Sequence, residues 1–430
     1  MRKVFIFLLC VFFGIGAHGA TLINDTETER LLTTLVAPVA TAANISPGRL
    51  KIHIVHDDDF NAFVSGGEDV YIYTGLLTQI KSPAALQAVV AHELGHTIGG
   101  HMVQMSQRMA AEMRRALLIQ ALGIGLMAAG GEPSLGGGVW AGGGGVATQG
   151  MLSFSRDEER MADNLGLDLM RRANQDPAAF VQVFEQMRDI TGAAEAKINP
   201  NRVNHPLTAE RLKNVREYIA AHPGKYQSSN SKYADEYELV RAKLVGYLDT
   251  PARIKALYPA SDNSSAALYA RAISDMRLGK YKDAAAGVKK LTSRMPDNGY
   301  FYELLGDIEF AAGDYDAAVA AYENALQHVP DAPQIQTALA LVLTERAAPG
   351  DNERARELCL RANLTSPGAL TYWALARGYG SDARANWALA EYYSFMGNDK
   401  KARSYAKKAQ KSLPHDTPEF IKSGDILQKK

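Results

Sequence analysis

The sequence is poor in cysteine and has no excess of charge of either sign. Two cysteines in 430 residues, Cys10 and Cys359, cannot supply a framework of disulfides. Lysine and arginine total 47, and so do aspartate and glutamate, so the basic excess that nucleic-acid binding requires is missing. Long apolar runs are missing as well, since Val4–Ile15 is far shorter than the roughly 20 residues that cross a bilayer. These absences exclude a disulfide scaffold, a nucleic-acid-binding protein and a multi-span membrane protein.

The N-terminus has the three parts of a secretory signal peptide. Arg2 and Lys3 precede the apolar run Val4–Ile15, and the small residues of Ala17–Ala20 follow it. Cleavage after Gly19 puts small residues at both recognised positions, and cleavage after Ala20 is the alternative. We therefore predict a signal peptide at residues 1–20, with an uncleaved anchor as the weaker interpretation. The exported chain then keeps Cys359 alone, which has no partner for an intramolecular disulfide.

The clearest chemical motif is His92-Glu93-Leu94-Gly95-His96. Ser82 followed by Pro83 is typical of a helix start, and the apolar residues after them predict a buried helix. On that helix His92 and His96 lie on one face and can bind one metal ion, with Glu93 as general base. The alternative is a pair of core histidines bonded to the backbone. His101 points roughly opposite His92 on a continuous helix, so we expect it to be structural or at the surface.

A catalytic zinc site needs three protein ligands and an open position for water. The acidic stretch Ser155–Asp163 contains the candidates for the third ligand. Glu159 and Asp163 are four residues apart and share a helical face, so Glu159 would bind the metal. Asp163 would then hydrogen-bond the far nitrogen of a ligand histidine. Spacing alone leaves Glu158 as an alternative ligand, and a solvated acidic helix as an alternative to any metal site.

Two stretches ahead of the metal helix are rich in β-branched or aromatic residues and predict strands, Leu50–Val55 and Val70–Tyr73. A strand placed just before a zinc helix can be the edge to which an extended peptide adds itself, and we give that role to Val70–Tyr73. The acidic triplet Asp57–Asp59 lacks the spaced ligands of a calcium loop and indicates a solvated turn.

Glycine is concentrated after the metal helix. Twelve of residues 123–150 are glycine, which a packed helix does not tolerate. The stretch lacks the Gly-Lys-Ser/Thr ending of a phosphate-binding loop. A mobile loop or hairpin beside the active site fits this composition, and contact with a membrane surface through residues 116–150 is the alternative.

The C-terminal half repeats with a period of 34 residues. Gly279-Lys280-Tyr281 recurs as Gly313-Asp314-Tyr315, and Pro296 recurs as Pro330. This is the period of the tetratricopeptide repeat, a pair of antiparallel helices. Four glycines precede a proline by 17 residues and so mark four units: Gly279, Gly313, Gly350 and Gly397. The third unit is stretched by three residues and the fourth by thirteen, around Tyr372–Ser381. Such arrays form a concave docking surface for peptide or protein.

These motifs resemble the gluzincin metallopeptidase family of BepA, HtpX and the CAAX-prenyl endopeptidase. The resemblance implies that Glu159, in the family's Glu-x-x-Ala-Asp motif, is the third zinc ligand. It also rests on Asn61-Ala62-Phe63 and on His205-Pro206 with Arg211 six residues after the histidine. In family members with repeats this histidine can fill the open zinc position and keep the enzyme latent, while the arginine lines the active site. The resemblance implies both roles for His205 and Arg211.

The predicted fold is mainly α-helical and has four parts along the chain. These are the signal peptide at 1–20, an α+β zincin-type metallopeptidase domain with a small sheet at 21–226, a linker with capping helices at 227–262, and an α-helical tetratricopeptide-repeat solenoid at 263–430. The resemblance implies one Zn²⁺ per chain and a periplasmic location.

The predicted function is zinc-dependent endoproteolysis of misfolded or stalled envelope proteins, with assistance to outer-membrane protein assembly through the repeats. Glu93 would take a proton from the attacking water and pass it to the leaving amine, and Arg211 would stabilise the oxyanion. The rival hypothesis is a periplasmic chaperone or assembly factor whose zinc site is latent or silent.

Overall fold

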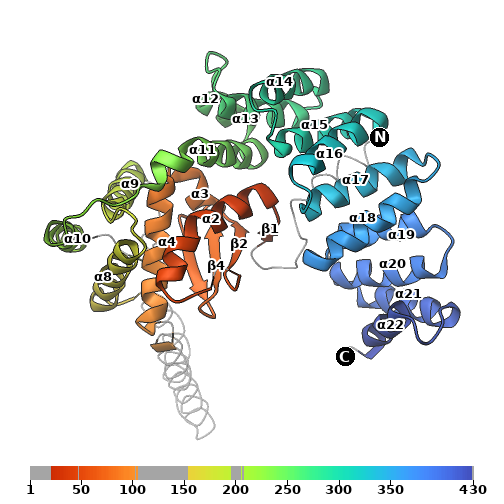
Figure 1. Ribbon diagram of the computed structural model, residues 1–430, viewed down its shortest axis with the longest axis horizontal. Helices are drawn as coiled ribbons and strands as arrows, with labels where there is room; N and C mark the ends of the chain where they lie inside the picture. The colour runs from red at the N-terminus through yellow and green to blue at the C-terminus, as the bar shows by residue number, and fades with distance from the viewer. Residues whose placement is uncertain are drawn as a thin grey trace, which may run out of the picture. The chain divides into compact units, whose positions relative to one another are not determined.

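A computed structural model describes residues 21–46, 48–101, 103–104, 154–194, 205 and 208–428. The predicted signal peptide and the glycine-rich stretch lie outside these residues. The predicted fold class is confirmed: the chain is mainly helical, with a small mixed sheet near its N-terminus and helical repeats after it (Figure 1). It divides into two compact units, Leu31–Tyr237 and the combination of Met1–Arg30 with Glu238–Lys430.

The sheet has four strands in the order β1-β2-β4-β3. Their bounds are β1 Thr21–Ile23, β2 Lys51–His56, β3 Ala62–Ser65 and β4 Asp69–Tyr73. Strand β4 pairs in parallel with β2, where Ile72 lies opposite Ile54, and antiparallel with β3, where Val70 lies opposite Val64.

Strand β4 is therefore paired on both sides, and the prediction that Val70–Tyr73 forms the edge is wrong. The two edge strands are β1 and β3, and the sequence analysis identified neither of them. Gly66 and Gly67 both have positive φ, at 61° and 83°, and make the tight turn that folds β3 back onto β4.

Helix α4 (Pro83–Ile98) starts as the sequence predicts. The Ser82 hydroxyl accepts a hydrogen bond from the amide of Ala85, and Pro83 occupies the first helical position. Helix α8 (Arg156–Arg172) starts with a capping box, in which the side chains of Ser155 and Glu158 bond to each other's backbone amides. Among the described residues of the range 31–237, the structure also has the helices α3 (Thr74–Gln79), α9 (Ala179–Ala194) and α10 (Ala209–Ala221).

Helices α4 and α8 pack with their backbones almost in contact. A Cβ added to Gly95 of α4 would lie 2.4 Å from the carbonyl oxygen of Ala162 on α8. A Cβ added to Gly166 of α8 would lie 3.0 Å from the carbonyl group of Ala91 on α4. This close approach requires glycine at both positions, and it carries the histidines of α4 toward the acidic face of α8.

The repeat unit is a series of antiparallel helix pairs (Figure 1). The repeat glycines Gly279, Gly313, Gly350 and Gly397 all have positive φ, between 64° and 86°, and each stands between two helices. The flanking pairs are α13 (Ser265–Arg277) with α14 (Tyr281–Arg294), α15 (Gly299–Ala312) with α16 (Tyr315–His328), α17 (Pro333–Arg346) with α18 (Asp351–Thr365), and α20 (Ala383–Phe395) with α21 (Asp399–Ser412).

An additional helix, α19 (Ala369–Tyr379), accounts for the long spacing before the fourth glycine. The remaining helices are α2 (Thr26–Ala42), α11 (Ser229–Leu248), α12 (Pro251–Leu257) and α22 (Pro418–Gln428). In the described part of the chain, no helix has both the length and the apolar character needed to cross a bilayer.

Candidate metal centre

Helices α4 and α8 bring three of the predicted ligands together in the interior. The Nε2 atoms of His92 and His96 are 3.1 Å apart. The Glu159 carboxylate lies 3.5 Å from the first of these nitrogens and 3.4 Å from the second. All three side chains are buried. Glu158, the alternative to Glu159, is occupied elsewhere, since its carboxylate accepts a 2.8 Å hydrogen bond from the backbone amide of Ser155.

The spacing of these atoms fits a single tetrahedral metal ion. Ligand atoms about 2.0–2.1 Å from a tetrahedral zinc are roughly 3.4 Å from one another. The two histidine nitrogens are 3.1 Å apart, His92 Nε2 is 3.5 Å from Glu159 Oε2, and His96 Nε2 is 3.4 Å from Glu159 Oε1. Together with His205, these residues place four ligand atoms within 4.8 Å of one another.

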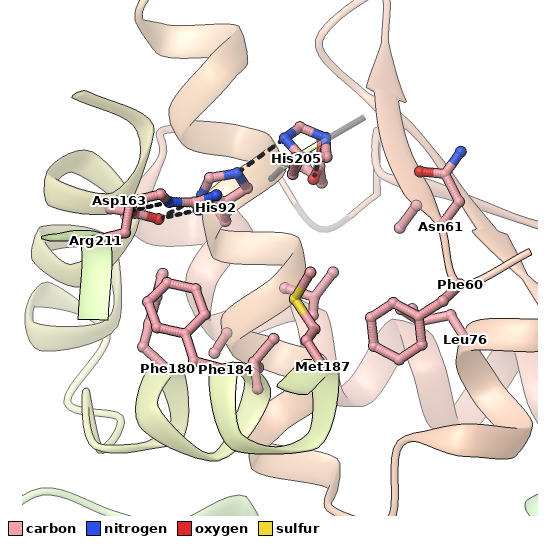
Figure 2. Close-up of a pocket in the computed structure, with 15 residues that line it drawn as sticks. Phe60, Asn61, Leu76, His92, Asp163, Phe180, Phe184, Met187, His205 and Arg211 are labelled. Carbon is pink, nitrogen blue, oxygen red and sulfur yellow. Dashed lines mark hydrogen bonds and ion pairs between the residues drawn. The ribbon is translucent and has the colours of Figure 1, made fainter. Parts of the chain in front are cut away.

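His205 lies against the predicted ligands and the predicted base. Its Nδ1 is 2.7 Å from Glu159 Oε1 and 3.3 Å from His92 Nε2, and its Nε2 is 3.5 Å from Glu93 Oε1. Figure 2 shows His205 across the pocket from Asp163, with His92 between them. The imidazole of His205 therefore stands where a fourth ligand of the ion would bind.

Asp163 and Arg211 form the outer layer of the centre (Figure 2). Asp163 Oδ1 lies 2.9 Å from His92 Nδ1, in an ion-pair contact rather than an aligned hydrogen bond. Arg211, on α10, donates two 2.8 Å hydrogen bonds to Asp163, and its Nη1 lies 2.7 Å from Glu159 Oε2. Burial opposes ionisation of Asp163, but the hydrogen bonds from Arg211 outweigh it and lower the pKa of this carboxyl group.

Burial and nearby charges give the two ligand histidines very different pKa values. Burial lowers the pKa of His92, but contacts with the Asp163 and Glu159 carboxylates outweigh it and raise the pKa to about 9. Burial dominates at His96 and lowers its pKa to about 4. Burial also raises the pKa of Glu93, although His205 and His92 oppose the shift. A raised pKa makes Glu93 a better proton acceptor near neutral pH.

Of the two alternatives predicted for His101, the surface position is wrong and the structural one agrees with its burial, although the ring contacts His96 instead of pointing opposite the histidine face of α4. Its side chain is buried, and its Nδ1 lies 3.0 Å from Nδ1 of His96. The continuous helix on which the prediction depended does not exist, because α4 ends at Ile98 and Gly100 has a φ of 69°. The pair Gly99-Gly100 is the sequence signal that could have revealed this turn.

Phe154 is a member of the site that the sequence analysis missed. Its ring centroid is 3.9 Å from that of His96 and 5.4 Å from that of His205. It precedes the helix cap Ser155, in the position where an apolar residue often packs against its own helix. No metal-binding pattern would have pointed to a phenylalanine.

An apolar pocket opens beside His92 and Glu93. In Figure 2, Phe180, Phe184 and Met187 extend into it from the ribbon in front, and Phe60 and Leu76 face them. Asn61 lines the pocket next to the edge strand β3. The pocket thus joins the polar centre to a surface suited to an apolar side chain.

Comparison with known protein families is consistent with this geometry. Residues 26–219 match peptidase family M48, and residues 269–333 and 304–369 each match the tetratricopeptide repeat. The M48 segment contains the whole centre from His92 to Arg211, and M48 is a metallopeptidase family. The predicted family resemblance and the predicted repeats are confirmed.

Curated proteins similar to this chain include several that join these two regions. The beta-barrel assembly-enhancing protease of Yersinia pestis is 26% identical over 347 residues, which cover 75% of this chain and 66% of that protein. Its counterpart in Escherichia coli K12 is 26% identical over 71% of this chain and 63% of its own length. Metalloprotease LoiP of E. coli K12 is 25% identical over 46% of this chain and 73% of its own length. The chain thus spans slightly less than two thirds of the two assembly-enhancing proteases.

Proposed function

We propose that this protein is a zinc-dependent endopeptidase that cleaves misfolded or stalled proteins of the cell envelope and assists outer-membrane protein assembly. The observation that carries the proposal is the buried group of His92, His96 and Glu159 with Glu93 beside it. Two imidazole nitrogens and a carboxylate gathered at these distances favour zinc over a harder cation. A zinc ion bound there supplies a Lewis acid that polarises an attacking water and the scissile carbonyl.

The chain's own residues would handle the proton and hold the centre in place. Glu93 takes a proton from the attacking water and hands it to the leaving amine, a task that its raised pKa favours. Asp163 keeps the His92 ring in orientation from the opposite side. Arg211 anchors Asp163 and Glu159 together, and it faces the pocket, where it would also stabilise the oxyanion.

His205 would gate this centre. In the position described above it contacts Glu159, His92 and Glu93, so a peptide carbonyl and a water cannot occupy the same space. We propose that this is the latent form and that activation requires His205 to leave.

The substrate would be an extended chain with an apolar side chain next to the cleaved bond. The edge strand β3 supplies backbone groups for such a chain, and the pocket lined by Phe180, Phe184 and Met187 accepts the side chain. Unfolded proteins expose such segments and folded ones bury them. The helical repeats would bind these proteins through their concave face and dock to the outer-membrane assembly machinery.

The location we propose is the periplasm, reached through the signal peptide predicted at residues 1–20. The name of the assembly-enhancing proteases supports a role in β-barrel assembly at the outer membrane. Contact with a membrane surface through residues 116–150 remains part of the proposal, although these residues lie outside the described part of the chain.

The rival function is a chaperone or assembly factor with a silent zinc site, and Glu93→Gln separates the two. This change keeps the shape of the side chain and removes the base. The variant should bind one zinc per chain, as the wild type does, and lose cleavage of denatured casein by at least about a hundredfold. Cleavage at the wild-type rate would contradict the peptidase function. Equal zinc content, measured by atomic emission, shows that the loss does not come from an empty site.

A further inference from the structure

His101 occupies the place behind His96 that Asp163 occupies behind His92. His96 turns its Nε2 toward His92 and Glu159, so its Nδ1 faces away from the candidate metal position. That outward nitrogen lies 3.0 Å from Nδ1 of His101. The two rings meet edge to face, with centroids 5.0 Å apart at 76°. Because His101 is only 1% exposed, bulk water does not compete with it for Nδ1 of His96.

Two imidazole nitrogens at hydrogen-bond distance cannot both carry a proton. A histidine that binds a metal through Nε2 carries its own proton on Nδ1 and needs an acceptor there. His96 is then the donor, and Nδ1 of His101 is the acceptor. This assignment puts the proton of His101 on Nε2, which lies 3.3 Å from the sulfur of Met161, a weak acceptor.

The backbone before His101 makes room for this ring. Gly99 follows the last turn of α4, and Gly100, with its positive φ, reverses the chain, so that the side chain of His101 returns over the end of the helix. A Cβ added to Gly99 would lie 2.6 Å from Nε2 of His101. Two consecutive glycines therefore permit the contact, and a side chain on Gly99 would displace the ring.

We infer that His101 is a positioning residue, a neutral imidazole acceptor that fixes the tautomer and the ring orientation of His96 for metal binding. The inference rests on the proposed metal site. The two ligand histidines then differ in the group that contacts their outward Nδ1: a carboxylate, Asp163, at His92, and a neutral imidazole, His101, at His96. An outer partner of this kind changes metal affinity by about 10–100-fold when it is lost.

The test compares two variants of the full chain in zinc binding, measured by competition with a chromophoric chelator. His101→Asn keeps an acceptor, because its Oδ1 is attached to Cγ as Nδ1 of histidine is. His101→Phe keeps a flat ring and removes the acceptor. The Phe variant should bind zinc about 10–100-fold more weakly than the wild type, and the Asn variant should remain close to the wild type. Wild-type affinity in the Phe variant, or an equal loss in both variants, overturns the inference.

Two further measurements keep packing and positioning apart. The metal-free Phe variant should melt at the wild-type temperature, and a drop there that matches the loss of affinity would assign His101 to packing alone. In the zinc-loaded wild type, long-range ¹H–¹⁵N spectra should show the His101 proton on Nε2, and a proton on Nδ1 overturns the inference. If His96→Ala still binds zinc with wild-type affinity, the proposed metal site itself fails, whatever the His101 variants do.

Discussion

Charge at the residue scale explains why a divalent cation suits the centre. Glu93, Glu159 and Asp163 are all buried, and Arg211 is the guanidinium that contacts Glu159 and Asp163. With all three carboxylates ionised and the ligand histidines neutral, one guanidinium leaves two negative charges; without a metal, protonation of His92, whose pKa is about 9, offsets one of them. Buried charges are costly unless they are paired, and a divalent ion bound to neutral histidines removes the excess. The ligand set and the charge of the site thus agree.

Removing the side chain of His205 should raise the peptidase activity. Replacing it with alanine removes the imidazole that contacts Glu159, His92 and Glu93, and so opens the position for water and substrate. If the latent form holds about nine tenths of the molecules, His205→Ala should raise cleavage of denatured casein about tenfold. The rate is measured at equal zinc occupancy.

The chain contains a matched control for this change. His222 also precedes a proline, but it is exposed, and its Nδ1 lies 2.9 Å from the backbone carbonyl oxygen of Tyr218. His222→Ala should leave the cleavage rate unchanged. A His205→Ala rate at or below that of the wild type would argue against gating and assign this histidine another role.

Among the secondary-structure elements, the centre depends on the close packing of α4 against α8. Two residues of α8, Glu159 and Asp163, face two of α4 only because glycine lies at each contact between the backbones. A side chain at these contacts would not be a local change, since it would push one ligand set away from the other.

We predict that Gly95→Ala destabilises the M48 segment and weakens its metal binding together. The new Cβ would lie 2.4 Å from the carbonyl oxygen of Ala162, and overpacking of this kind costs about 1–3 kcal/mol. Circular dichroism melts and zinc content measure the two effects. Gly287→Ala in α14 is the control, because its Cβ would meet Ala272 at an ordinary 3.4 Å and the helix gains from alanine. A Gly95→Ala chain that melts and binds zinc as the wild type does would refute the argument.

The same elements show how far the sequence could be interpreted without a structure. Helix α4 was predictable, because Ser82, Pro83 and the four-residue histidine spacing are local signals. The shared helical face of Glu159 and Asp163 suggested a third ligand on α8, but the choice of Glu159 over Glu158 came from the family resemblance. His205 and Arg211 belong to a later segment, and no spacing rule connects them to His92, so only the family resemblance proposed them.

The predictions for the edge strand and for the position of His101 failed because local sequence patterns do not show where the chain reverses. The order β2-β4-β3 depends on the turn at Gly66 and Gly67, which makes the four-residue strand β3 an edge. His101 was assigned from a helix angle, although Gly99 and Gly100 end the helix before it. In both cases the glycines were visible in the sequence, but the positive φ angles of Gly66, Gly67 and Gly100 were not.

At the scale of the whole molecule, the unit that contains the repeats buries a cluster of charges drawn from distant parts of the sequence. The amine of Lys243 on α11 lies 2.5 Å from Asp25 and 3.0 Å from Glu27, and the Tyr269 hydroxyl donates to Glu27 at 2.8 Å. Glu303 on α15 lies 4.0 Å from the same amine. These contacts fix the start of α2 to helices α11 and α13, in a cluster with more carboxylates than Lys243 alone can pair.

This excess should make the stability of the repeat unit depend on pH through Glu303. Burial raises the pKa of Glu303 to about 8, although Lys243 opposes the shift. The folded chain therefore holds this proton more tightly than the unfolded chain, whose carboxyl group has the ordinary pKa of 4.5. The stabilisation is complete below that ordinary value and is lost as the pH rises through about 8.

Glu303→Gln keeps the neutral form, so its melting temperature should fall less than that of the wild type between about pH 5 and pH 9. Glu353→Gln, at an exposed position on α18, should follow the wild type. Parallel curves for Glu303→Gln and the wild type would show that Glu303 does not carry the pH dependence.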